Sequence, residues 1–501
     1  MEPTGVALSA KVDWAGNGFG VGAYDDITAR VISGNISRSG GSCVLVLDNT
    51  DGRFWPDNAG SPLYGLVKPG PRCRVVVTYS ATTYRLFGGL LRRIVPIAEA
   101  GGAATVTLVM EDHLQLRKMR EGLATVAEQA AGSLRQAILD AVGLTSGYRD
   151  LTVCPEDEML GASYVDKGTA MVDALSELNE ATLTRHFMRA GPDETYYTQY
   201  VARDRQYHLD AAVEDTWTDA DIASIDGLDY SYDNVVNIQS VDGTAVLPQS
   251  SQDVWASTVQ YVIAAGGSKV VWAKLPAFTW APEMTTTVGG EVGRVLTQAP
   301  RPTATRRRPS FVLGLSASVT YLLGGPVTVG IVAYGESAKL TLTNTGGAET
   351  TVRGIVLAGR PMIATDSDPV EVQDATSITN YGARSGSPRS SRYIASPTLA
   401  TGVGDHIVWR LKDPRQQPSV TMLNRFPRCF NRELYEQVAV TSTKGHISAK
   451  RFEILDIEWS FSKDADWTTV YQLREAPEQS PAAFFHWGGT LGASSSPRLG
   501  Y

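Results

Sequence analysis

The stretch CVLVLDNTDGRFWPDNAGSPLYGLVKPG, residues 43–70, carries the strongest structural signal in the sequence. It begins with five apolar residues, Cys43 to Leu47, which indicate a buried strand. Asp, Asn, Gly and Pro then dominate, and these residues favour tight turns and proline-constrained loops. Pro69-Gly70 marks a turn before the next apolar run, Arg74 to Tyr79. The stretch therefore predicts a strand, an ordered loop and a second strand.

Short strands and turns continue beyond this stretch to residue 112. Arg85–Ile97 and Thr105–Met110 are rich in Val, Leu and Thr, and they flank a Gly-rich turn at 98–104. This pattern is typical of a β-hairpin. We expect the first 112 residues to form a small β barrel.

Helical periodicity appears next. Apolar residues between Leu123 and Ala141 recur every three to four positions, and Gly143 follows as a C′ residue, so the spacing predicts an amphipathic helix. A second helix is predicted over roughly Thr169 to Phe187. Short strands return at 196–240, and the tyrosine-containing segment Asp226–Asn237 is predicted to start another sheet.

The later parts of the chain are again rich in strand patterns. Residues from about 248 to 362 show no helical period and alternate apolar positions with Ser, Thr and Gly, which predicts an inserted β-sandwich. In Phe452–Phe461 the two-residue alternation slips between Ile454 and Leu455, as a β-bulge requires. Asp464-Ala465-Asp466 is predicted to turn the chain into a last strand.

These patterns predict a β-rich α+β multidomain protein, with small β barrels, flanking α/β segments and an inserted β-sandwich. The length of 501 residues also favours several domains. The predicted divisions are an N-terminal barrel at 1–112, an α/β segment running into a second barrel at 113–247, the sandwich at 248–362, a second α/β segment at 363–430, a C-terminal barrel segment at 431–475 and an extended tail at 476–501.

Composition excludes several classes of protein. Lys and Arg number 45 against 53 Asp and Glu, and the formal net charge of −8 disfavours an electrostatic grip on DNA phosphates or anionic lipid. Four widely spaced cysteines exclude a disulfide scaffold or a zinc module, and they favour a reducing compartment. We expect no secretion signal, because Met1 to Asp13 lacks a basic region followed by an apolar region, and no membrane span, because no run of about 18 apolar residues occurs.

Motifs for catalysis are largely missing. The sequence lacks G-x-S-x-G, G-x-x-x-x-G-K-[ST] and H-E-x-x-H, which weakens an enzyme interpretation. Gly16–Ala23 matches G-x-G-x-x-A, but strand-like residues follow where a dinucleotide site needs a helix, so we interpret it as a turn. Six scattered histidines, among them His113, His186 and His208, favour core or surface positions over an acid/base pair. Glycoside cleavage by a pair of carboxylates stays open as a hypothesis, because the two acidic residues can come from any part of the chain.

Two charged clusters also stand out. An acidic group could supply oxygen ligands for calcium, yet its spacing matches no calcium loop, and a solvated acidic turn is favoured. Its members are Asp210, Glu214, Asp215, Asp219, Asp221 and Asp226. The basic group Arg301, Arg306, Arg307 and Arg308 is interpreted as an exposed loop. We therefore predict no metal site, no cofactor and no catalytic residue.

Aromatic residues suggest where partners bind. Large aromatic side chains dominate interface energetics, so five of them are candidate partner contacts. They are Trp55, Tyr64, Phe484, Phe485 and Trp487. For Trp55 and Tyr64, a place in the core is an equal alternative. The Ser-, Gly- and Pro-rich tail around the last three is predicted to become ordered only against a partner.

A series of spaced motifs resembles the minor tail proteins of long-tailed phages that infect actinobacteria. The motifs are Asp48–Phe54, Pro56–Asn58, Ser61–Gly70 and Leu86–Gly89. The Asp374–Gly382 stretch and the ending Phe452–Leu473 resemble the last modules of phage baseplate hubs and related injection-machine hubs. The resemblance is densest in residues 40–112 and 374–473 and weakest in the predicted sandwich.

This resemblance implies a homotrimeric hub at the phage tail tip, in a virion assembled in the host cytoplasm. Three subunits with two similar barrels each would match the sixfold distal tail protein and tail tube above, and threefold fibre or spike proteins below. Tape-measure protein and phage DNA would pass through a central channel, the DNA only in transit. Weak negative charge suits such a passage.

Two other function classes stay open. A tail-associated cell-wall hydrolase would need an appended catalytic domain, and we expect none because the chain ends about 26 residues past the last predicted strand. A host-surface glycan-binding adhesin would use the predicted sandwich, with Trp272 or Trp280 as exposed aromatics. We favour the structural protein over both, and we expect no enzymatic activity.

Overall fold

The structure is a computed structural model of the chain. It describes residues 5–19, 25–97, 104–116, 123–126, 129–151, 159–160, 163–165, 168–203, 212–228, 230–242, 246–248, 251–275, 311–323, 327–333, 337–364, 369–391, 393–394, 397–462 and 467–477.

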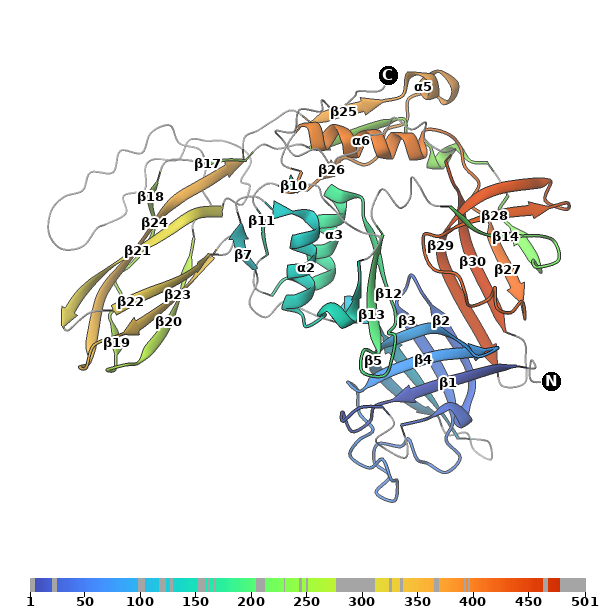
Figure 1. Cartoon of the computed structure of the whole chain (residues 1–501), viewed down its shortest axis with the longest axis horizontal. Coiled ribbons are helices and arrows are strands. Elements are labelled where there is room, and N and C mark those ends of the chain that lie inside the picture. Colours follow the sequence, from blue (N-terminus) through green and yellow to red (C-terminus); the bar gives the residue numbers. More distant parts are fainter. Residues whose placement is uncertain are drawn as a thin grey trace.

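Six N-terminal strands form one half of a twelve-stranded sheet (Figure 1). Their order in the sheet is β1-β4-β5-β6-β3-β2, and all neighbours are antiparallel. The hairpin predicted around residues 98–104 is confirmed, since Ile97 pairs with Thr105 and Leu90 with Glu111. The strands are β1 (Val6–Val12), β2 (Val31–Ser37), β3 (Ser42–Asp48), β4 (Arg72–Tyr79), β5 (Thr82–Ile97) and β6 (Thr105–Glu111).

Six later strands form the other half of the same sheet. Strand β2 pairs with β29, so that Ile36 lies opposite Trp459, and the order continues through β30 and β27 to β15. Strand β28 pairs with β29 in antiparallel orientation and with β14 in parallel orientation. These strands are β14 (Val213–Trp217), β15 (Ser224–Asp226), β27 (Ser419–Leu423), β28 (Gln437–Ser442), β29 (Ile447–Ser462) and β30 (Thr468–Glu475).

The predicted separate small barrels are wrong, because no sheet among the described strands closes on itself. Strand β2 uses one edge for β3 and the other for β29, so it cannot also pair with β1. The segment before β2 instead approaches β1, where Val12 N donates to Asp25 O at 2.8 Å. The two halves therefore share one hydrophobic core that runs from Ala10 to Leu473.

The predicted bulge in the closing strand is confirmed. Ile454 pairs with Leu473 and Asp456 with Gln472, which leaves Leu455 as the extra residue. An extra residue reverses the inward and outward faces of a strand. Phe452 and Ile454 before the bulge and Ile457 and Trp459 after it are consequently all fully buried. The predicted turn at 464–466 lies outside the described residues.

A layer of helices adjoins the sheet. Helices α2, α3 and α6 share a second core with the small sheets β12-β13-β9 and β25-β16-β26. The elements of this layer are α1 (His113–Leu116), β7 (Leu123–Val126), β8 (Gln129–Ala130), α2 (Ala131–Ala141), η2 (Ser146–Tyr148), β9 (Arg149–Asp150), β10 (Met159–Leu160), β11 (Ser163–Val165), α3 (Met171–Thr182), β12 (Arg185–Ala190), β13 (Thr198–Arg203), η3 (Tyr232–Asn234), β16 (Ile238–Asp242), β25 (Val370–Gln373), α5 (Ala375–Tyr381), β26 (Arg389–Ser390) and α6 (Pro397–Leu411).

The predicted helices are present but shorter. Helix α2 begins at Ala131, because the residues before it form β7 and β8. It ends as predicted: Gly143 has φ +80°, and Leu144 N donates to Leu139 O at 2.8 Å. Helix α3 ends at Thr182, since Leu183 adopts a left-handed conformation that turns the chain into β12. Within Asp226–Asn237 the chain forms η3, and the next strand begins only at Ile238.

In the described parts of residues 246–364, eight strands form two facing sheets. A five-stranded sheet gathers β17, β18, β19 and β21 on the long β24, and a three-stranded sheet has the order β20-β23-β22. Leu340 and Leu342 of one sheet and Ile355 and Leu357 of the other are fully buried in a common core. The strands are β17 (Val246–Pro248), β18 (Gln252–Ser257), β19 (Tyr261–Ile263), β20 (Ser268–Lys274), β21 (Phe311–Leu323), β22 (Val327–Ala333), β23 (Ser337–Asn344) and β24 (Thr350–Ala364).

This sandwich lies apart from the twelve-stranded sheet, with the helical layer between them (Figure 1). Among the described helices, none combines the length and apolarity needed to cross a membrane.

Candidate functional site

The loop at residues 49–70 is held by its own polar side chains. Asn49 Oδ1 accepts a hydrogen bond from Phe54 N at 2.9 Å, and Ser61 Oγ donates to Arg53 O at 2.6 Å. Phe54 and Leu63 are buried, and the Phe54 ring lies 5.8 Å from that of Trp14. The motif residues of this loop therefore have structural roles, because they fix the loop against the end of the core.

The structure places two of the predicted partner contacts on this loop. Tyr64 is exposed, with 58% of its surface accessible, whereas Trp55 is half-buried beside Gly52. Phe484, Phe485 and Trp487 lie outside the described residues, as does the Arg301–Arg308 group. Of the two described candidates, Tyr64 is therefore the more exposed.

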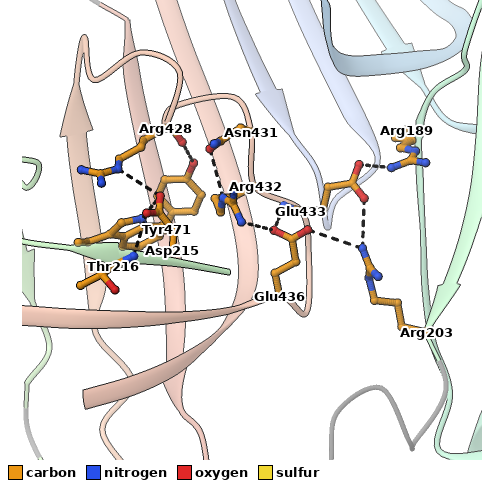
Figure 2. Close-up of polar contacts among 11 residues, drawn as sticks. Arg189, Arg203, Asp215, Thr216, Arg428, Asn431, Arg432, Glu433, Glu436 and Tyr471 are labelled. Atoms are coloured by element: carbon orange, nitrogen blue, oxygen red, sulfur yellow. Dashed lines mark hydrogen bonds and ion pairs between the residues drawn. The ribbon is translucent and has the colours of Figure 1, made fainter. Parts of the chain in front are cut away.

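The most concentrated polar chemistry lies where the helical layer meets the large sheet (Figure 2). Glu433, in the segment before β28, is held by Arg189 of β12 and by Arg203 of β13, whose Nη2 is 3.3 Å from Glu433 Oε2. Glu436 accepts from Glu433 N at 3.1 Å and lies 3.8 Å from Arg203 Nη2 and 3.4 Å from Arg432 Nη1. We name Arg189, Arg203, Arg432, Glu433 and Glu436 the junction cluster.

The two glutamates of the junction cluster differ in pKa. Burial raises the pKa of Glu436 to about 7, and the Glu433 amide and Arg432 only partly oppose this. Burial also acts on Glu433, but the charges of Arg189 and Arg38 outweigh it and lower that pKa. Such a divided pair resembles an acid/base couple. Both carboxylates are nevertheless occupied by arginines, which suits a structural ion network.

Arg38, from the turn between β2 and β3, is close enough to Glu433 of the junction cluster to lower its pKa. Its guanidinium donates to Arg85 O at 2.8 Å and lies 5.0 Å from the Trp459 ring centroid. Burial lowers the pKa of Arg38 to about 10. This one side chain therefore contacts both halves of the twelve-stranded sheet.

A second ionic group joins the same two layers. Glu453 of β29 is buried and pairs with Arg410 of α6, with Arg185 of β12 at 3.0 Å and with Arg474 of β30 at 2.9 Å. Burial lowers the pKa of Arg410 to about 9, an effect that Glu453 opposes. One carboxylate thus ties a helix to strands of two different sheets.

Three described aspartates of the acidic cluster are engaged in ion pairs and hydrogen bonds. Asp215 and Asp221 pair with Arg428, and Asp219 accepts hydrogen bonds from Ser442 and Thr443, which lower its pKa to about 2. Asp210 lies outside the described residues. In the part of the chain that the structure describes, no group of three or more His, Cys, Asp or Glu side chains could hold a metal ion.

Of the histidines singled out in the sequence, His113 lies in the core and His186 is half-buried. His113 is buried, and its Nε2 lies 2.5 Å from the hydroxyl of Tyr197. His186 Nδ1 is 2.8 Å from Asn179 Nδ2, and burial together with Arg135 lowers the pKa of His186 to about 3. His186 is therefore neutral near pH 7 and is unsuited to proton transfer there. His208 lies outside the described residues.

The G-x-G-x-x-A match forms a turn where it is described. Gly16 and Gly18 have positive φ, and the amides of Asn17 and Gly18 donate to Asp13 Oδ1. The next described residues, from Asp25, pair with β1 and lead to the three-residue η1 (Thr28–Arg30), so no long helix begins there.

A tyrosine-lined pocket was not found by sequence reasoning. Tyr230, Ser231, Tyr232, Tyr381 and Pro414 line a pocket of about 270 Å³. In the sequence, Tyr230 and Tyr232 lie in the segment Asp226–Asn237, which is predicted only to start a sheet. Tyr381 and Pro414 come from segments some 150 or more residues away, so nothing local in the sequence could have grouped them.

Comparisons with known proteins gave structural likenesses alone. No protein-family model matches the sequence, and no curated protein matches it either. The 43 kDa tail protein of prophage MuSo2 from Shewanella oneidensis is similar over 93% of this chain and 98% of its own, with 10% identity and a TM-score of 0.48.

Two further solved structures are similar. A tail protein from Neisseria meningitidis aligns over 94% of this chain and 97% of its own, with 10% identity and a TM-score of 0.45. The E. coli c3393 protein, described as a component of the type VI secretion system, aligns over 91% of this chain and 77% of its own, with 9% identity and a TM-score of 0.39. At these TM-scores the likeness carries no functional argument.

Proposed function

We propose that the chain is a structural protein of a phage tail tip, a homotrimeric hub that adapts the sixfold tail tube and distal tail ring to threefold components below. The proposal starts from the tail-protein motifs in residues 40–112 and the hub-like segments in residues 374–473. In this role the chain surrounds the path of the tape-measure protein and of the DNA, and it performs no turnover.

One observation carries the proposal. The two motif-bearing regions contribute to one sheet, in which six strands from β1 to β2 are followed by six from β29 to β15 and β14. A subunit with two six-stranded halves gives a trimer six comparable surfaces. Three subunits could therefore contact a sixfold ring through equivalent parts, as closed symmetry requires.

The ionic groups support a scaffold role. The charged side chains of the junction cluster and Glu453 form ion pairs between the sheet and the helical layer. Removing one partner of such a group is costly, so the relative orientation of the layers is well specified. A rigid subunit suits a ring that must keep a channel of constant shape.

End-on negative-stain images of the purified protein test this proposal. We expect class averages with threefold symmetry and six similar lobes around a central opening. Monomeric particles, or rings of another symmetry, would contradict it. Release of reducing ends or peptides from purified actinobacterial cell walls would favour the hydrolase instead.

A specific observation favours glycan binding as a second candidate function. Trp272 of β20 is 40% exposed on the outer face of the three-stranded sheet, in a row with Lys339 and Val332. An exposed indole can stack on a sugar ring, and a neighbouring ammonium can bind sugar hydroxyls. Trp280 lies outside the described residues.

A glycan array probed with the full chain tests this second function. Binding to actinobacterial glycans that the Trp272→Ala variant loses would support it. A matched control is Trp55→Ala, on the distant 49–70 loop, which should bind as the unchanged protein does.

A further inference from the structure

The tyrosine pocket lies at the surface and keeps two large aromatic side chains accessible. Tyr230 is 61% exposed and Tyr232 is 56% exposed. The Tyr232 and Tyr381 rings lie 6.0 Å apart at 51°. Exposed aromatic side chains gathered at a pocket are typical of a binding site.

Cations surround the tyrosines of this pocket. The Arg384 guanidinium lies 5.5 Å from the Tyr232 ring centroid, and Lys450 Nζ lies 4.8 Å from that of Tyr230. Lys450 Nζ also donates to the Tyr230 hydroxyl at 2.6 Å. These contacts hold the rings in place, and an added aromatic residue could pack against their exposed surface and against the two cations.

The end of the last strand lies beside the pocket. Glu475 Oε2 is 2.9 Å from Lys450 Nζ, so the same ammonium binds Glu475 and Tyr230. Gln416 makes a second link, because its backbone N donates to Glu475 Oε2 at 3.1 Å and its side-chain Nε2 donates to Leu228 O at 2.9 Å. The main chain is fixed up to Ala476, whose N donates to Arg451 O at 2.9 Å.

The residues that follow have suitable chemistry and length. Three of the four residues Phe484, Phe485, His486 and Trp487 are large apolar aromatics. Phe484 lies seven positions after Pro477, and seven residue steps span at most roughly 25 Å when fully extended. The aromatic segment can therefore reach a pocket that begins one lysine side chain away from Glu475.

We propose that the Phe484–Trp487 segment of the same chain occupies the tyrosine pocket formed by Tyr230, Tyr232, Tyr381 and Pro414. The segment then covers exposed tyrosine surface and links the C-terminal end of the sheet to helix α5. This inference does not depend on the proposed function, since it concerns contacts within one subunit.

Photo-crosslinking of the full chain tests the proposal. We would place p-benzoylphenylalanine at Phe485, irradiate the protein, and map the products by mass spectrometry. The expected product has the mass of a single chain and joins the tail to peptides that contain Tyr230 and Tyr232, or Tyr381. The reciprocal probe at Tyr232 should crosslink to the tail.

Matched variants distinguish specific binding in the pocket from non-specific contact with exposed tyrosines. With the probe at Phe485, Tyr232→Ser should lower the crosslink yield at least fivefold. Tyr64→Ser, which removes a similarly exposed tyrosine from the 49–70 loop, should leave the yield unchanged.

Three outcomes would overturn the proposal. Crosslinks that map to other surfaces would place the aromatic segment elsewhere. A product of two-chain mass that joins the same peptides would assign the pocket to the tail of a second copy. A lack of any tail–pocket product from both probe positions would show that the segment does not bind there.

Discussion

The twelve-stranded sheet and the inserted sandwich are both built from antiparallel strands, but they are joined to the rest of the molecule in different ways. The sheet meets the helical layer through buried Arg–Glu groups around Glu433 and Glu453. The sandwich closes its own core between its two sheets. The difference indicates that buried ion pairs fix the orientation of the helical layer on the twelve-stranded sheet. The sandwich is stabilised by its own hydrophobic core instead.

Of the substitutions that test this difference, Glu453→Gln should lower the free energy of unfolding most. It leaves Arg185, Arg410 and Arg474 near a neutral side chain in a buried position. We expect the free energy of unfolding to fall by about 3–5 kcal/mol, because an uncompensated buried charge is costly. Urea unfolding, followed by tryptophan fluorescence, measures this change in the free energy of unfolding.

Glu458→Gln is the control for this variant, since Glu458 lies on the same strand with an exposed side chain. It should change the free energy of unfolding by less than about 0.5 kcal/mol. Equal losses in the two variants would show that the Glu453 group has no special role.

Matched cavities test whether the sandwich unfolds as a separate unit. Leu45 lies in the core of the large sheet and Leu340 in that of the sandwich, and both are fully buried. Each Leu→Ala change should cost about 2–5 kcal/mol. Calorimetry should resolve two transitions, with Leu340→Ala lowering only one and Leu45→Ala only the other. A single transition that both variants shift together would make the modules one cooperative unit.

A pair of glycines tests the junction of the two six-stranded halves. A Cβ on Gly34 of β2 would lie 2.4 Å from Phe461 Cζ of β29, whereas a Cβ on Gly330 in the sandwich meets nothing within 3.7 Å. Gly34→Ala should therefore destabilise by about 1–3 kcal/mol through overpacking. Gly330→Ala should be close to neutral by the same urea measurement, and an equal cost for both would refute the close packing of β2 on β29.

The smallest expected effect is the pH dependence of the junction cluster. The pKa of Glu436 is raised to about 7 from the ordinary 4.5, so the folded protein binds more protons than the unfolded chain between these values. Stability should consequently fall as pH rises from 4.5 to 7, by roughly 1–3 kcal/mol from this group. His186, with its lowered pKa, has the opposite slope below pH 6.5.

Glu436→Gln isolates the contribution of that one carboxyl. Subtracting the stability profile of the variant from that of the unchanged protein should leave a difference that declines with pH between 4.5 and 7. A flat difference would mean that Glu436 ionises normally in the folded protein.

Local features of the fold could be predicted from sequence, because they depend on neighbouring residues. The slip at Leu455 and the glycine at 143 each have a physical requirement that a few positions reveal. The start of α2 was missed, since the apolar spacing from Leu123 onward suits β7 and β8 as well as a helix.

Long-range features could not be predicted in this way. The pairing of Ile36 with Trp459 joins segments more than 400 residues apart, and it replaced the expected barrels with one sheet. The partners of Glu433, Glu453 and the pocket tyrosines are likewise brought together only by the fold. Sequence patterns mark which residues are charged or aromatic, but they do not say which of them meet.

Light scattering of the purified protein measures whether the chain forms the proposed trimer in solution. Three copies of the 53.9 kDa chain in a closed ring give about 162 kDa, and the proposed trimer should keep this mass over a wide concentration range. A stable mass near 53.9 kDa at every concentration would contradict the assignment of the chain as a trimeric hub.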